Sequence, residues 1–74
     1  MRNRKFTKIT GKNSTICVRV TEIEAIGFNP DAIIINTSGG LEIHVIINDD
    51  QTNEKVVEEI LNGYDINVID IYRQ

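Results

Sequence analysis

The feature that most constrains the fold is a pair of aliphatic segments on either side of a glycine turn. Residues 32–37 and 41–48 are rich in β-branched side chains, and residues 38–40 between them read Ser-Gly-Gly. Two such segments around a short glycine turn are typical of a β-hairpin. A phosphate-binding loop would instead require a lysine after the glycines and a helix in place of the second segment. We therefore predict an antiparallel hairpin at the centre of the fold.

The second strand of this hairpin has two unequal faces. Alternate residues of a strand point to opposite sides, so the aliphatic residues at the odd positions from 41 to 47 share one face, which we expect to be core. The opposite face includes Ile34, His44 and Ile46. A sheet with apolar residues on both faces needs cover on both sides. We expect a helix on one side and a second subunit on the other, with an oligomer interface at Ile34, His44 and Ile46.

The first part of the chain predicts another hairpin. Residues 6–10 and 15–20 are again rich in β-branched residues, and residues 11–14 between them have a turn composition. Residues 21–24 match the Thr-x-x-Glu capping box, which begins helices. The few residues between this motif and Gly27 could form either a single helical turn or a short strand. We expect a turn and then a short extended segment that ends at Phe28.

Residues 56–61 place their apolar side chains at the spacing of a helix. Asp50 or Thr52 is able to cap its first turn, and the Asn-Gly pair at residues 62–63 is expected to end it. Residues 64–72 then alternate as a strand does. This strand has no later partner, so it has to pair with an earlier strand or with another chain.

These elements predict a small α+β domain over residues 1–74, with an antiparallel sheet of four to five strands and one helix in the order β-β-β-β-α-β. A chain of this length buries only about 60–65% of its unfolded surface. Cys17 is the single cysteine, so no internal disulfide can form, and one Cys with one His cannot complete a structural zinc site. Self-association is the remaining source of stability, and we predict a homo-oligomer.

The charges are divided along the chain. Residues 1–19 contain six basic residues and no acid, whereas residues 20–74 contain two basic and eleven acidic residues, which gives charges of +6 and −9. Such a division favours a basic surface that binds an anion or an acidic partner. The alternative is that both regions serve only to keep the protein soluble. The predicted ligand-binding residues are Arg2, Arg4, Lys5, Lys8 and Arg19.

Phe6 lies within the basic segment, so a nucleotide could pair with the cations and also stack on the ring. A long nucleic acid is disfavoured, because the acidic remainder of the chain would repel it. A small anionic ligand or an acidic protein partner avoids that repulsion. We expect a non-enzymatic oligomeric protein, phage or mobile-element encoded, that captures a small anionic, nucleotide-type ligand between its subunits. Between the subunits, symmetry would bring together basic residues from each copy and form a concave basic pocket.

Catalytic and metal-binding patterns are weak in this sequence. His44 has the chemistry of a general acid or base, but its one reactive partner, Cys17, lies on a different strand and no third, orienting residue is evident. Asp49, Asp50 and Glu54 carry the oxygen ligands of a hard cation. They lack the EF-hand spacing, and helix capping accounts for them. We expect no enzyme activity, no metal and no cofactor.

The first residues, MRNRKFTK, are basic but lack the apolar segment and the cleavage site of a signal peptide. No apolar run approaches the roughly 20 residues that span a bilayer. We therefore expect a cytoplasmic protein without a membrane partner. The abundance of Ile and Asn is compatible with an AT-rich genome of bacterial or phage origin.

Four short motifs follow one another along the chain. Residues 23–26 read Ile-Glu-Ala-Ile, residues 29–35 read Asn-Pro-Asp-Ala-Ile-Ile-Ile, and residues 38–40 form the glycine turn before an apolar strand. Residues 56–60 then read Val-Val-Glu-Glu-Ile. This order, over about residues 7–61, resembles the short flagellar-operon proteins of the FlbD type. The resemblance implies a small β-rich layout and a regulatory protein that docks an acidic protein partner.

Overall fold

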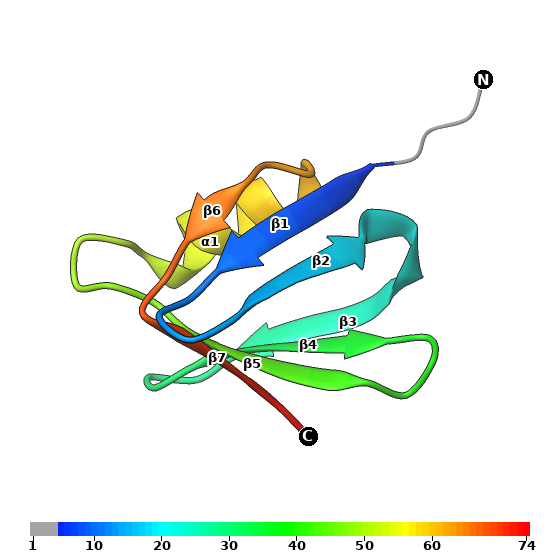
Figure 1. The fold of residues 1–74 in the computed structure, drawn as a ribbon, viewed down its shortest axis with the longest axis horizontal. Coiled ribbons are helices and arrows are strands. Elements are labelled where there is room, and N and C mark those ends of the chain that lie inside the picture. The colour runs from blue at the N-terminus through cyan, green and yellow to red at the C-terminus, as the bar shows by residue number, and fades with distance from the viewer. Residues whose placement is uncertain (1–4) are drawn as a thin grey trace.

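Seven strands, one α-helix and one 3-10 turn make up residues 5–74, the part of the chain that the computed structural model describes. In chain order they are β1 (Phe6–Thr10), β2 (Thr15–Arg19), η1 (Val20–Glu22), β3 (Ile23–Phe28), β4 (Ile33–Thr37), β5 (Glu42–Ile46), α1 (Asn53–Leu61), β6 (Ile66–Asn67) and β7 (Asp70–Arg73). The strands form sheet A, in the order β2-β1-β6, and sheet B, in the order β3-β4-β5-β7 (Figure 1). The predicted α+β class with one helix is confirmed, but the strands are divided between two sheets.

The division into two sheets follows from the path of the chain after the helix. β6 pairs parallel with β1, and β7 pairs antiparallel with β5. Between them the Val68 N–H donates to the Thr10 carbonyl at 2.9 Å, and the Ile69 N–H donates to the Ile46 carbonyl at 2.8 Å. The strand predicted over residues 64–72 is therefore two short strands that link the sheets, and both have partners within the chain.

Both predicted hairpins are present. The β1–β2 turn is closed by the Gly11 N–H, which donates to the Ser14 carbonyl at 2.8 Å. In the β4–β5 hairpin Ile35 lies opposite Ile43, and the turn contains Gly40 at a φ of 88°. This left-handed conformation is one that glycine adopts without a steric cost, so the Gly-Gly pair serves a turn.

The capping-box segment forms a single turn followed by a strand, as expected. The Ile23 N–H donates to the Val20 carbonyl and closes η1, and β3 begins at Ile23. The residue at the N-cap of this turn is Arg19, and its side chain makes no capping hydrogen bond. The next turn is closed by Asn29, whose Oδ1 accepts from the N–H groups of Asp31 and Ala32 at 2.8 and 2.9 Å.

Of the two expected helix caps, Thr52 is the one that forms. Its hydroxyl oxygen accepts from the Lys55 N–H at 3.2 Å at the start of α1. Val56 and Ile60 are buried, whereas Leu61 is 47% exposed, so the helix presents a narrower apolar face than its sequence indicated. Within the described residues no helix is long and apolar enough to span a bilayer.

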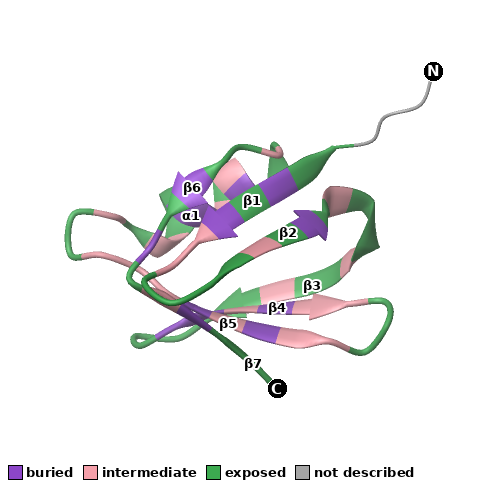
Figure 2. Ribbon diagram, viewed as in Figure 1, coloured by how far each residue is buried: buried purple, intermediate pink, exposed green. Residues whose placement is uncertain are grey.

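The core lies between the two sheets and α1, and Figure 2 shows the buried residues along the strands that enclose it. Its fully buried aliphatic residues are Ile9 of sheet A, Ile33, Ile35, Ile43 and Val45 of sheet B, and Val56 and Ile60 of α1. Thr7 is completely buried as well, and its hydroxyl donates to the Tyr64 carbonyl at 2.6 Å. This bond attaches β1 to the segment that leaves the helix.

Candidate functional site

Lys8 and Arg19 lie on the exposed face of the β1–β2 hairpin. Phe6 is opposite Arg19, and Lys8 is opposite Cys17. All four residues are exposed, whereas Thr7 between them points to the core. Long side chains reach both their direct and their diagonal neighbours across a strand pair, so the two cations form one cluster. We call the exposed side chains of Phe6, Lys8, Cys17 and Arg19 the basic strand face.

Arg19 is oriented on this face and remains accessible. The Arg19 Cζ atom lies 5.4 Å from the centroid of the Phe6 ring, in a cation–π contact. Its Nη1 atom lies 3.6 Å from Glu22 Oε2, and the two side chains are 47% and 54% exposed. An ion pair this exposed contributes only about 0–1 kcal/mol. An incoming carboxylate or phosphate can therefore replace Glu22 at little cost.

Lys5 is separate from the basic strand face. It precedes β1, and a Cβ atom added to Gly63 would lie 3.4 Å from both Cβ and Cδ of Lys5. The aliphatic part of Lys5 therefore passes beside the end of α1. Arg2 and Arg4 lie outside the described residues. Of the five predicted ligand-binding residues, the structure brings together Lys8 and Arg19.

The predicted interface residues lie together on the outer face of sheet B. Ile34 is opposite His44, and His44 is opposite Tyr72 on β7. Ile34, His44 and Ile46 are half-buried, while Tyr72 is 54% exposed. His44 Nε2 lies 2.6 Å from Glu42 Oε2. Tyr72 was missed in the sequence because only the pairing of β7 with β5 reveals its position.

The two residues considered for a catalytic dyad lie in different sheets. Cys17 is on β2 in sheet A, and His44 is on β5 in sheet B. A dyad built across neighbouring strands would require these two strands to adjoin. They do not adjoin. Over residues 5–74, no three His, Cys, Asp or Glu side chains are grouped in a way that could hold a metal ion.

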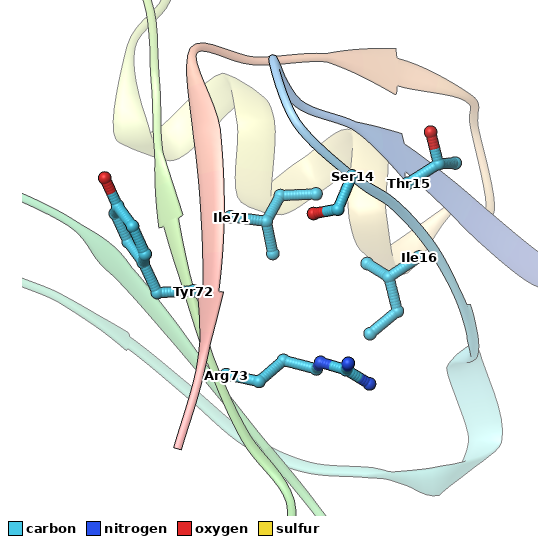
Figure 3. A pocket seen from close by; sticks show the side chains of 6 residues that line it. All are labelled: Ser14, Thr15, Ile16, Ile71, Tyr72 and Arg73. Carbon is cyan, nitrogen blue, oxygen red and sulfur yellow. The ribbon is translucent and has the colours of Figure 1, made fainter.

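A cleft of about 440 Å³ opens between the beginning of β2 and β7 (Figure 3). It is lined by Ser14, Thr15, Ile16, Ile71, Tyr72 and Arg73. Figure 3 shows Ile71 and Arg73 directed toward β2, with the Tyr72 ring on the other side of its strand. Arg73 is the charged member of this lining. It was missed in the sequence because the cleft joins residues from opposite ends of the chain.

A second hollow, of about 350 Å³, lies beside the start of α1. Its lining residues are Pro30, Asp31, Ile47, Asn48, Asp49, Gln51, Thr52 and Asn53. The two carboxylates in that lining disfavour an anionic ligand. Neither hollow is lined by Lys5, Lys8 or Arg19, so the basic strand face lies outside both hollows.

Both candidate surfaces involve β2. The basic strand face includes its outward side chains, and the cleft runs beside its first residues. A scan against protein-family models and searches of curated proteins and of solved structures found no match for the chain. Function is therefore inferred from the chemistry of these two surfaces.

Proposed function

We propose that this protein is a non-enzymatic binding protein that docks an acidic segment of a partner protein on the basic strand face. The observation that carries the proposal is the juxtaposition of Lys8 and Arg19, beside Phe6, on one exposed strand face. Small-molecule sites are concave and enclose their ligand. An exposed strand face that lines neither hollow instead suits an extended segment, which contacts several side chains at once. This role is also the one that the resemblance to FlbD-type proteins implies.

The charge distribution favours a short acidic segment. Residues 20–74 carry a charge of −9, so a long polyanion that extends beyond the basic strand face meets repulsion. A segment of a few residues stays within reach of Lys8 and Arg19. Complementary charge also raises the rate of association and selects against basic partners.

The experiment compares Lys8→Glu with Lys55→Glu. Both changes alter the net charge equally, but Lys55 is exposed on α1, away from the basic strand face. The measurement is fluorescence anisotropy of a labelled glutamate-rich peptide at low salt. Lys8→Glu should weaken binding about 3- to 30-fold, because an attraction of about 1 kcal/mol or less becomes a repulsion of similar size. Lys55→Glu should change it less than about twofold.

Salt gives a second measure of the same interaction. Exposed charge pairs are screened over about 10 Å at 0.1 M salt, so binding should weaken steeply as salt rises. If Lys8→Glu and Lys55→Glu weaken binding equally, the peptide responds only to net charge, and the assignment of the basic strand face is wrong.

A second candidate function is capture of a small anionic, nucleotide-type ligand between copies of the chain. Phe6 is 43% exposed and stacks with Arg19, and an aromatic ring beside a cation suits a base and its phosphate. In this case Ile34, His44 and Ile46 would lie where the copies meet. Light scattering should then show an oligomer, and heating should release a phosphorylated compound. A monomer that releases none contradicts this function.

A further inference from the structure

The free edge of β2 presents backbone hydrogen-bonding groups directly beside the basic strand face. The Gly11 N–H donates to the Ser14 carbonyl, which makes this pair a hydrogen-bonded position of the β1–β2 ladder. Bonded and non-bonded pairs alternate along an antiparallel ladder. With the register Thr10–Thr15 and Lys8–Cys17, the N–H and C=O groups of Thr15 and Cys17 point away from β1.

No strand in the described part of the chain pairs with this edge. β2 is the last strand of sheet A, and the chain continues through η1 into β3, which pairs with β4. The cleft opens beside Thr15 and Ile16, with β7 as its other wall. On β7 the Ile71 N–H already donates to Asp70 Oδ1 at 2.9 Å. The Ile71 N–H is therefore occupied, whereas the outward N–H groups of β2 adjoin the basic strand face.

The edge strands β2 of sheet A and β3 of sheet B differ in regularity. β3 has a register shift between Ile23 and Ala25, and such bulges protect an edge from pairing with another strand. β2 is in continuous register with β1 from Phe6–Arg19 to Thr10–Thr15, and it contains no proline. Of the two edges, β2 is the one that retains a regular template for strand addition.

We propose that the edge of β2 adds an extended strand from a partner protein, in which acidic residues alternate with aliphatic ones. Alternate side chains of an added strand lie on opposite faces. One set would lie on the basic strand face near Lys8 and Arg19, which suits carboxylates. The other set would enter the cleft against the half-buried Ile16, with Arg73 at its far wall. This inference rests on the proposed function and specifies the partner's conformation and pattern.

The test uses two labelled peptides of the same composition, each about nine residues long, so that they span a strand the length of β2. One alternates glutamate with valine, and the other groups its glutamates before its valines. The alternating peptide should bind at least about tenfold more tightly, because only it places both kinds of side chain correctly along the edge. In the unaltered protein it should also slow amide hydrogen exchange at Thr15 and Cys17.

Cys17→Pro tests the edge without changing any charge. Proline removes the N–H that points to the free edge, and it leaves the hydrogen-bonded pairs with β1 in place. Binding of the alternating peptide should weaken about tenfold or more, since proline also obstructs neighbouring hydrogen bonds. Cys17→Thr keeps the N–H and changes only the side chain, so the loss of affinity that Cys17→Pro shows beyond Cys17→Thr measures the N–H. If the proline variant does not fold, amide hydrogen exchange at Thr15 and Cys17 in the unaltered protein still tests strand addition.

The outcomes separate this inference from the proposed function. Equal binding of the two peptides, with no added protection at Thr15 and Cys17, would overturn strand addition. If Lys8→Glu still weakened that binding, the basic strand face would remain a docking surface. If neither peptide bound the unaltered protein, both proposals would be overturned.

Discussion

Replacing Gly11 with alanine tests the junction at which the two sheets meet. A Cβ atom at this position would lie 3.0 Å from Asp70 Cα, 3.2 Å from the Asp70 carbonyl carbon and 3.2 Å from Ile71 Cγ1. Two of these are backbone atoms, which cannot rotate away as a flexible side chain can. Either the β1–β2 turn or β7 would have to move, and overpacking of this kind costs about 1–3 kcal/mol.

Gly27→Ala on β3 is the matched control. A Cβ atom there would meet no atom within 4 Å. Both substitutions restrict the unfolded chain, which stabilises the folded state by about 0.4–1 kcal/mol where the site accepts the new side chain. We therefore expect Gly27→Ala to raise the free energy of unfolding slightly. Gly11→Ala should lower it by a net amount of about 0.5–2 kcal/mol.

Urea denaturation followed by circular dichroism measures this difference, and thermal melting provides a second reading. In a domain of this size a loss of 1 kcal/mol lowers Tm by about 4–8 °C. The core of so small a domain supplies only about 3–5 kcal/mol, so Gly11→Ala should still fold but melt earlier. If both variants unfold at the same urea concentration, the close approach of β7 to the β1–β2 turn is refuted.

Three other substitutions test contacts that hold the elements in place. Thr7→Val should lower the free energy of unfolding by about 1 kcal/mol, because the Tyr64 carbonyl loses its 2.6 Å donor; an unchanged urea midpoint would contradict this. Thr52→Ala should also cost about 1 kcal/mol through the lost helix cap, and Thr52→Ser, as control, should retain most of the stability. Ile43→Val should cost about 0.5–1.5 kcal/mol, since Ile43 is fully buried. Ile34→Val should lower the free energy of unfolding by less in dilute protein, because Ile34 is only half-buried. If urea denaturation gave equal losses for the two variants, the two faces of sheet B would be wrongly assigned.

The elements that could be predicted from the sequence are those whose signals are local. The β4–β5 hairpin follows from alternating aliphatic residues around Gly40, which takes a positive φ. The start of α1 follows from Thr52, whose hydroxyl needs only a backbone N–H three residues later. In both cases the atoms that decide the structure are a few positions apart, so the pattern of side chains carries the information.

The candidate site was predictable only in part. Lys8 and Arg19 belong to one hairpin, and strand alternation is enough to place them on the same face. Lys5 looks equivalent in the sequence, but the fold brings its side chain beside Gly63 at the end of α1. Arg73 showed no signal, because it acquires its role from Ser14 and its neighbours across the cleft.

By itself, the sequence determined the α+β class, both hairpins, the helix, and the inward face of β5, since short-range periodicity and turn chemistry specify each of them. Only the tertiary structure decided that the last strand divides between two sheets. The break at Val68 and Ile69 arises because these neighbours donate to carbonyls of different sheets, at Thr10 and Ile46. Those partners are remote in sequence, so no local pattern encodes the choice. The same choice leaves the β2 edge unpaired within residues 5–74 and opens the cleft beside it.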